Sequence, residues 1–300
     1  RKALWRSVDR FFRSYIGKRG YRDGFLGFVV AALGGMYQCL SWIKYSEATQ
    51  ALRVEDVVEP FRTLFVDQER YDRALLMSHL CAYRTAAAQA RDACLLEIGS
   101  GAGYGAYYLS HVARDVVGID QDRANIEQAS RLFSRSNLRF LEMDGARLSF
   151  AEQSFDVVGS FQVIEHIPED QLQPFVREVA RVLSPTGCLV VSTLNLEHNR
   201  KGRADYVKAP FHVKEFTPKE LQALLSSVFQ QVEIFGLYPR WRYRIARRLR
   251  KWGLNRWGPA GRNPLRRFLD AVTTDDHVLR SRCTTAAIDL IAICRKEKSP

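Results

Sequence analysis

The sequence predicts an α/β fold in which a largely parallel sheet is covered by helices on both faces. From residue 67 onward, short apolar runs typical of buried strands alternate with stretches of helical periodicity, and such alternation implies a parallel sheet. The runs are almost continuously apolar, as strands buried on both faces are. A chain of 300 residues is long enough for one large domain or two small ones.

The predicted elements follow one another in order. Seven strands are expected, at 93–98, 115–120, 138–144, 155–161, 187–193, 228–238 and 286–294. Helices are expected at about 67–90, at 125–135 and at 172–184. The last of these ends at the Ser184-Pro185 pair, because proline disfavours helix in the residue before it. The alternating pattern alone establishes no helix of ordinary length between the final two strands.

The first 66 residues differ from the rest and are predicted to form a separate membrane-docking segment with a connector at 44–66. Residues 25–43 carry no charge over nineteen positions, which is the lower limit for a membrane span. The stretch before them alternates basic and aromatic residues, as a helix in the headgroup layer does. An in-plane helix or hairpin is favoured, and a true span or a buried helix remains open. Residues 67–300 form the second domain.

Positive charge is concentrated at two places. The formal net charge is +12, yet residues 1–22 hold eight Lys or Arg against one acid, and 240–268 hold eleven and no acid. Such patches favour anionic lipid headgroups or nucleic acid. Within the predicted basic insertion at 239–285, four apolar residues recur at helical spacing, namely Trp241, Ile245, Leu249 and Trp252. An interfacial membrane helix is expected there; a solvated basic helix and nucleic-acid binding are the alternatives.

The cysteines and the first residue bear on the compartment. The six cysteines include no C-x-x-C pair, so neither a zinc site nor a disulfide framework is indicated. No secretory signal with a cleavage site is visible. We therefore expect a cytoplasmic protein, peripheral at the inner face of a membrane. Because the chain begins with Arg1 rather than Met, we expect it to be part of a longer polypeptide.

A glycine-rich loop follows the first predicted strand, in the stretch "LLEIGSGAGYG" at 95–105. Strand, glycine turn and helix together direct backbone N–H groups at a ligand. The pattern alone is ambiguous, because "GAGYGA" from Gly101 also fits the G-x-G-x-x-A dinucleotide fingerprint. A plain structural turn or another nucleotide site gives the same letters.

Three acids at consecutive strand ends limit which ligands the loop can bind. Glu97 can meet an ammonium group, whereas it would repel a pyrophosphate. Asp120, 21 residues after Gly99, stands where a carboxylate accepts from ribose hydroxyls. Asp144 stands where an acid followed by backbone amides can contact an adenine edge. Each acid alone could be a solvated strand end, but the three together describe S-adenosylmethionine.

The motifs in this order resemble those of class I S-adenosylmethionine-dependent methyltransferases, in particular the type-11-like ones. The resemblance runs from about 67 to 238 and resumes at 286–296, and rests on "LLEIGSGAGYGAYYLS", "VVGIDQD", "FLEMDGARLSFAEQSFDVVGSFQVIEHIPE" and "EVARVLSPTGCLVVST". It implies an enzyme with a Rossmann-like, doubly wound seven-stranded sheet that ends in an antiparallel hairpin. The cofactor-binding positions it implies are Glu97, Gly99, Ser100, Gly101, Gly103, Asp120, Gln121, Asp144, Gly145 and Gln162. Ser100 and Glu97 replace the commoner Cys and Asp.

Two histidines are candidates for the base that removes a proton from the methyl acceptor. His212, in "APFHVKEFT", is preferred and His166, in "VIEHIPE", is second, since each follows a predicted strand at the end where ligands bind. A purely structural role is the alternative for both histidines, as a helix cap in the case of His166. No cluster of metal ligands is visible in the sequence, so no metal is predicted. The stretch "FHVKEFTPKEL" resembles one in bacterial methyltransferases of cell-surface polysaccharide clusters.

The N-terminal stretch points to the same acceptor. "FFRSYIGKRGYRDGFLGFVVAALGGMYQCLSWIKYSE" resembles the membrane-docking tail of bacterial family 2 glycosyltransferases, although no glycosyltransferase domain is present. The expected function is therefore O-methylation of a sugar on a lipid-linked or surface glycan, with a fused or bound glycosyltransferase as partner. A quinone or small phenol, or RNA, is the alternative acceptor. A membrane scaffold with a degenerate methyltransferase fold is the non-enzymatic alternative.

Overall fold

The structure is a computed structural model that describes residues 73–201, 203, 205–257 and 263–296. The chain divides into two units, Arg1–Asp56 and Val57–Pro300, and every described residue belongs to the second. The predicted membrane-docking segment and connector at 1–66 lie outside the described residues, as does the glycosyltransferase-like stretch within them.

One sheet of eight strands forms the centre of the described part, in the order β3-β2-β1-β4-β5-β8-β6-β7. The strands are β1 (Cys94–Ile98), β2 (Asp115–Asp120), β3 (Leu138–Glu142), β4 (Phe155–Phe161), β5 (Leu183–Leu194), β6 (Gln231–Pro239), β7 (His277–Arg280) and β8 (Asp289–Arg295). The first five run parallel to one another. β8 is antiparallel to both β5 and β6. The carboxyl ends of β1 to β5 therefore meet at one edge of the sheet.

The prediction of seven strands is wrong by one. The extra strand, β7, lies inside the basic insertion and pairs antiparallel with Gly236–Pro239 of β6. It spans only four residues, too few for an alternating pattern to stand out in the sequence. The predicted antiparallel pairing of the last two expected strands is confirmed by β6 and β8.

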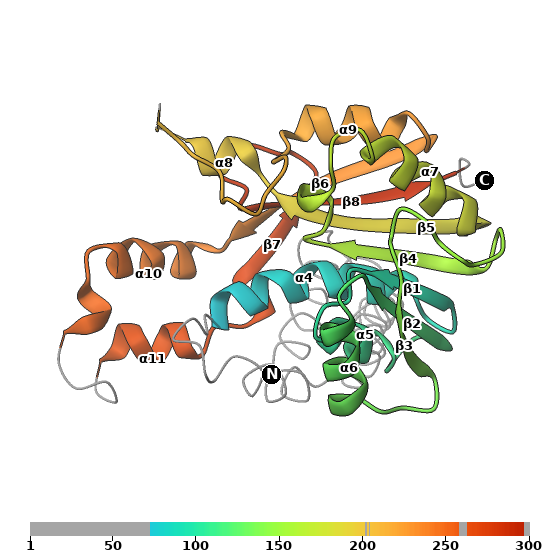
Figure 1. Cartoon of the computed structure of the whole chain (residues 1–300). Coiled ribbons are helices and arrows are strands. Elements are labelled where there is room, and N and C mark those ends of the chain that lie inside the picture. The colour runs from blue at the N-terminus through green and yellow to red at the C-terminus, as the bar shows by residue number, and fades with distance from the viewer. Residues whose placement is uncertain (1–72, 202, 204, 258–262, 297–300) are drawn as a thin grey trace, which may run out of the picture. The chain divides into compact units, whose positions relative to one another are not determined.

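Helices cover both faces of the sheet. They are α4 (Arg73–Gln89), α5 (Tyr104–Leu109), α6 (Arg123–Leu132), α7 (Leu172–Val182), α8 (Leu196–Arg200), α9 (Pro218–Ser226), α10 (Trp241–Lys251) and α11 (Pro264–Asp270). Figure 1 shows α4, α5 and α6 on one face and α7 and α9 on the other. The insertion holds α10, at the place where the Trp and Arg spacing predicts a helix, and α11, which was not predicted. None of the helices in the described part is long and apolar enough to cross a membrane.

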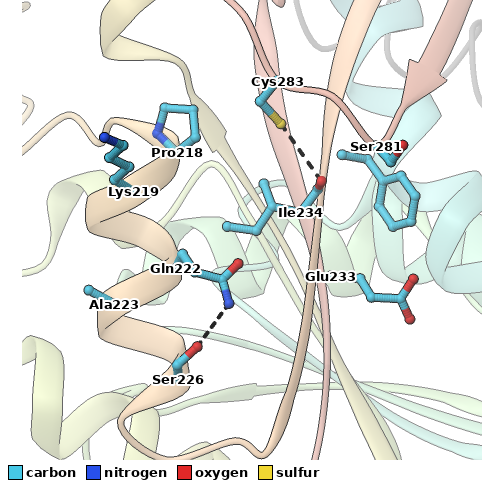
Figure 2. A pocket seen from close by; sticks show the side chains of 10 residues that line it. Pro218, Lys219, Gln222, Ala223, Ser226, Glu233, Ile234, Ser281 and Cys283 are labelled. Carbon is cyan, nitrogen blue, oxygen red and sulfur yellow. Dashed lines mark hydrogen bonds between the residues drawn. The ribbon is translucent and has the colours of Figure 1, made fainter.

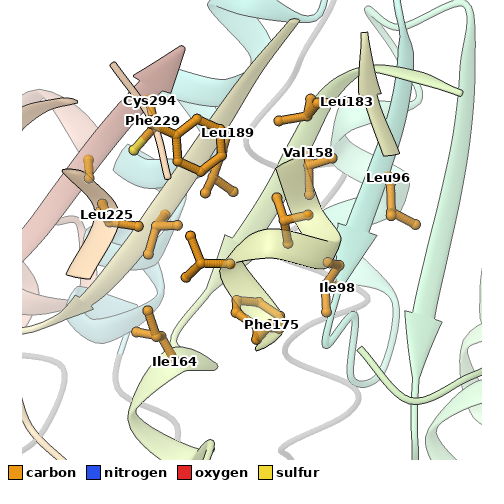
Figure 3. Close-up of a cluster of buried hydrophobic side chains, with 14 of the residues drawn as sticks. Leu96, Ile98, Val158, Ile164, Phe175, Leu183, Leu189, Leu225, Phe229 and Cys294 are labelled. Carbon is orange, nitrogen blue, oxygen red and sulfur yellow. The ribbon is translucent and has the colours of Figure 1, made fainter. Parts of the chain in front are cut away.

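A continuous apolar core fills the space between the sheet and α7 and α9 (Figure 3). α7 contributes Phe175, Val176, Val179 and Val182, all at most 1% exposed, because its apolar residues fall on one face at helical spacing. They meet strand residues such as Val158 and Leu189. This packing fixes the ends of β4 and β5, from which the loops at the carboxyl edge begin.

The outer edge of β6, which is the edge that does not pair with β8, borders a groove. A cavity of about 630 Å³ lies between α9 and β6 (Figure 2). Because β7 pairs with only the last four residues of β6, no described strand pairs with that edge from Gln231 to Phe235. Side chains contact it instead: Gln222 donates to the Val232 carbonyl at 3.4 Å and the Cys283 thiol to the Ile234 carbonyl at 3.7 Å.

Candidate active site

A cavity of about 590 Å³ opens at the carboxyl edge of the parallel strands. Seven residues predicted from the sequence line it, namely Gly99, Asp120, Gln121, Asp144, Gly145, Gln162 and His166. They come from the carboxyl end of β2 and from the segments that follow β1, β2, β3 and β4, which is where open α/β sheets bind their ligands. Four predicted residues, Glu97, Ser100, Gly101 and Gly103, lie in or below the glycine loop and are not among the lining residues. Neither is His212.

The glycine loop has a backbone that other residues would strain. Gly99 has φ 73°, and a Cβ there would come within 2.4 Å of Val163 Cγ2. Gly103, with φ 87°, is the N-cap of α5. The N–H groups of Gly99 and Ser100 both donate to the Ile119 carbonyl at 2.8 Å. The loop is thus fastened to the end of β2, and its glycine side leaves the cavity open to a ligand.

Asp120 joins this loop to the cavity wall. Its Oδ2 accepts from the Gly101 N–H at 2.8 Å, and its Oδ1 accepts from the Asp122 N–H at 2.9 Å. Carboxylate oxygens have further lone pairs, so these bonds leave Asp120 able to accept from a pair of ligand hydroxyls. Asp144 forms a similar turn, accepting from the Ala146 N–H at 2.9 Å.

Glu97 lies beneath the loop and is completely buried. Tyr83 donates to its Oε1 at 2.6 Å, whereas its Oε2 has no hydrogen-bond partner in the described part of the chain. Burial raises the pKa of Glu97 to about 8, against the opposing effect of the Tyr83 hydrogen bond. Glu97 does not line the cavity, but the next residue, Ile98, does. A buried oxygen without a partner at this position suits an ammonium group or a water bound to one.

Gln162 marks the turn out of β4. Its backbone adopts φ 57°, which is uncommon for a residue other than glycine and clusters at functional sites. The Gln162 N–H donates to the Ser192 carbonyl at 2.9 Å. This turn directs the short helix η3 (Ile164–His166) along the cavity.

The two candidate histidines are neighbours. His166, at the end of η3, lines the cavity, and the centroid of its ring is 5.2 Å from that of His212. His212 belongs to the connection between α8 and α9, and its Nδ1 is 2.9 Å from Glu215 Oε1. With Glu165 these histidines form a group whose ligand atoms, one from each residue, all lie within 4.8 Å of one another. The sequence showed no such cluster; the fold assembles it from two loops.

Several site residues were missed by the sequence analysis. Tyr83, which holds Glu97, comes from α4 and gives no local signal. Phe175, of α7, lines the cavity although its spacing indicates only a core residue. Glu215 stands three residues after His212, and that spacing is the one signal that could have linked the pair before the structure was known.

The residues present fit S-adenosylmethionine. Asp120 lines the cavity and can accept from the ribose diol, and the glycine loop leaves room for the methionine part of the cofactor. The unpartnered oxygen of Glu97, one residue before the lining residue Ile98, suits its amino group. Residues 96–191 also match the family model of the methyltransferase domain, a range that runs from β1 into β5. The chain therefore carries an S-adenosylmethionine-dependent methyltransferase domain, an enzyme domain whose cofactor is S-adenosylmethionine.

Individual relatives agree on this class. The chain is 40% identical over 157 residues to a "probable S-adenosylmethionine-dependent methyltransferase" of Mycolicibacterium smegmatis, a match that covers 52% of this chain and 56% of that protein. It is 33% identical over 103 residues to a ubiquinone biosynthesis O-methyltransferase of Azorhizobium caulinodans, covering 34% and 40%. The chain thus spans about half the length of the curated relatives it matches.

A solved structure shares the fold. The SAM-dependent methyltransferase from Thermotoga maritima superposes with a TM-score of 0.53 at 15% identity, covering 80% of this chain and 100% of that one. At that identity the likeness concerns the fold alone.

Proposed function

We propose that this chain O-methylates a hydroxyl group on a lipid-linked or cell-surface glycan. The observation that carries the proposal is that Asp120, Asp144 and His166 line one and the same cavity, with His212 next to His166. The first two would hold the cofactor, which supplies an electrophilic methyl group when bound. His166 lines the same cavity and His212 is its neighbour, so the two histidines are placed to act on an acceptor bound there. A sugar hydroxyl has a very high pKa and needs such help to become a nucleophile.

Removing His212 is expected to abolish methyl transfer while cofactor binding persists. The His212 ring is only 9% exposed and is held by Glu215, so His212→Ala removes an oriented group beside the cavity and none of its lining residues. Transfer of a tritium-labelled methyl group into membrane extracts, followed by separation of the labelled fractions, measures the effect. His111→Ala, at the amino-terminal side of β2, is the matched control. Label confined to protein or RNA, or a fully active His212→Ala enzyme, would contradict the proposal.

A quinone precursor or small phenol is the second candidate acceptor. One relative of this chain is a ubiquinone biosynthesis O-methyltransferase, and a phenol hydroxyl needs less activation than a sugar hydroxyl, because its pKa is about 10. The same labelling experiment separates the two, since the label would then appear in the quinone fraction. The glycan is preferred because residues 211–217 and the N-terminal stretch both resemble glycan-assembly proteins.

We further propose that α10 docks the chain on an anionic membrane surface. Three tryptophans in and just after this helix are largely exposed: Trp241 at 65%, Trp252 at 76% and Trp257 at 77%. The helix is buried instead through Tyr243 and Ala246. Arginines alternate with the exposed rings and no acid occurs between 240 and 268. Aromatic rings among basic residues suit a headgroup layer. The proposed segment at 1–66 and a glycosyltransferase partner would act at the same surface.

Substitution of both Trp241 and Trp252 by alanine is expected to reduce binding to anionic vesicles at least tenfold. The two rings would no longer be buried in the headgroup layer. A tenfold weaker binding corresponds to a loss of about 1.4 kcal/mol for both rings together. Co-sedimentation of the full chain with anionic and neutral vesicles measures it, and high salt should release much of the protein. Leu132→Ala with Leu141→Ala removes two other exposed apolar side chains as control. Retention on RNA in preference to vesicles would contradict the proposal.

A further inference from the structure

The group formed by Glu165, His166 and His212 has a construction that proton transfer alone does not require. Its members come from the connections that follow two neighbouring strands, β4 and β5. The N–H groups of Val213 and Lys214 donate to the Glu165 carbonyl at 2.8 and 3.1 Å. These backbone bonds fasten the His212 loop to η3, so the three side chains are held together by the fold.

Each histidine has one ring nitrogen committed to an oriented acceptor. The Nδ1 of His166 is 2.9 Å from the Phe211 carbonyl oxygen, which can only accept, so this Nδ1 carries the proton. The Nδ1 of His212 is 2.9 Å from the Glu215 carboxylate and donates in the same way. In both neutral rings the lone pair is then left on Nε2. Metal-binding histidines are oriented by this arrangement, with the other ring N–H on a carbonyl or carboxylate.

The carboxylates are oriented as well. Glu165 is 1% exposed, and its Oε2 accepts from the Thr193 hydroxyl at 2.9 Å. Glu215, which holds His212, accepts from the Tyr206 hydroxyl at 2.7 Å through its Oε2. All three potential ligands therefore have fixed partners behind them. The side of the group that these partners do not occupy borders the cofactor cavity through His166.

We propose that Glu165, His166 and His212 bind one divalent first-row transition-metal ion, and that this ion holds the acceptor hydroxyl. Two imidazoles and one carboxylate suit Mn²⁺, Fe²⁺, Co²⁺ or Zn²⁺ better than Mg²⁺ or Ca²⁺, which prefer all-oxygen ligands. Three protein ligands leave open positions for substrate oxygens.

The part of this inference that concerns the acceptor rests on the proposed function. The ion withdraws electron density from the bound hydroxyl, which loses its proton to water. The oxygen then forms the new C–O bond as the bond between sulfur and the methyl carbon breaks, with both of its electrons leaving on sulfur. His212 acts in this scheme as a ligand, in place of the base predicted from the sequence.

The experiment begins with metal binding by the full chain after treatment with a chelator. Electron paramagnetic resonance counts free Mn²⁺ during titration, and competition gives the affinity for Zn²⁺. One ion should bind per chain, and His166→Ala and His212→Ala should each weaken binding at least tenfold. Glu215→Gln should weaken it about 10–100-fold, as loss of an orienting partner does. His111→Ala should leave it unchanged. His166 is exposed, so its variant tests the site even if a substitution at the buried Glu165 disturbs folding.

Two further measurements separate the possible failures. S-adenosylmethionine binding is titrated on the same metal-free protein, and methyl transfer is measured with and without added Mn²⁺. No metal binding, or binding that none of the three variants affects, would overturn the site while leaving the methyltransferase proposal intact. Full transfer in the presence of chelator would overturn the role of the ion and restore His212 as the base. Metal binding without labelling of any hydroxyl compound would leave the site standing and remove the proposed function.

Discussion

Replacement of Asp120 by alanine is expected to weaken S-adenosylmethionine binding by more than tenfold. The carboxylate lines the cavity, and hydrogen bonds to a charged group contribute about 1.5–3 kcal/mol, whereas a factor of ten corresponds to about 1.4 kcal/mol. The same change also frees the Gly101 N–H, which loosens the glycine loop. Isothermal titration calorimetry on the purified chain measures the loss.

Two variants separate ligand binding from damage to the loop. Asp120→Asn keeps an oxygen for the Gly101 N–H and removes the charge, so it should bind more weakly than the wild type and more tightly than Asp120→Ala. Asp115→Ala removes an exposed acid at the other end of the same strand and should change nothing. Tight binding of NAD with no binding of S-adenosylmethionine would refute the assignment of Asp120 to the ribose of this cofactor.

Glu97 is expected to make the cofactor-free chain less stable as the pH rises from about 4.5 to about 8. Its pKa is about 8 in the folded chain against a usual 4.5, so in this window the folded state holds a proton that the unfolded state has released. The free energy of unfolding then falls with pH, at most by about 1.4 kcal/mol per unit from this one group. Below pH 4.5 both states are protonated and the effect vanishes.

Glu97→Gln should remove this dependence. Glutamine keeps an acceptor for Tyr83 and cannot ionise, so the variant should match the wild type near pH 4.5 and melt at a higher temperature near pH 8. Thermal unfolding of both proteins across this range measures the difference. The comparison of the two proteins is needed because burial raises the pKa of Asp289 to about 7. This group therefore adds a similar pH dependence of stability to both curves. Glu142→Gln, at the exposed end of β3, is the control. Parallel curves for wild type and Glu97→Gln would contradict the prediction.

The sequence predicted the parts of the fold whose signals are local. β2 and β4 have the predicted limits, because polar residues bound their apolar runs on both sides. The helix expected at 172–184 ends two residues early, at Val182, because Leu183 already begins β5. β7 was missed because its four residues gain their strand conformation from pairing with β6, a contact that no local pattern records. The Trp and Arg spacing predicted a helix in the insertion, and α10 is that helix.

Part of the candidate site could likewise be predicted from local sequence signals, and part could not. The glycine loop and the acids at 120 and 144 follow strands directly, so their convergence at one edge of the sheet could be inferred from strand order. The hydrogen-bond partner of Glu97 could not be inferred, because Tyr83 reaches Glu97 from α4 through packing. Nor could the gathering of Glu165, His166 and His212, since it depends on the backbone bonds that fasten the loop before α9 to η3. Residues 46 positions apart in the chain show no relation until those loops are in place.

The outer edge of β6 has a consequence for the behaviour of the chain in concentrated solution. An unpaired strand edge is a template onto which another chain can add a strand, the first step of edge-to-edge aggregation. The carbonyls of Val232 and Ile234 already accept from Gln222 and Cys283, and Glu233 places a charge on the strand between them (Figure 2). These side chains oppose strand addition where β7 is too short to reach. Oxidation or alkylation of Cys283 would remove its hydrogen bond and leave the Ile234 carbonyl free to accept one from a second molecule.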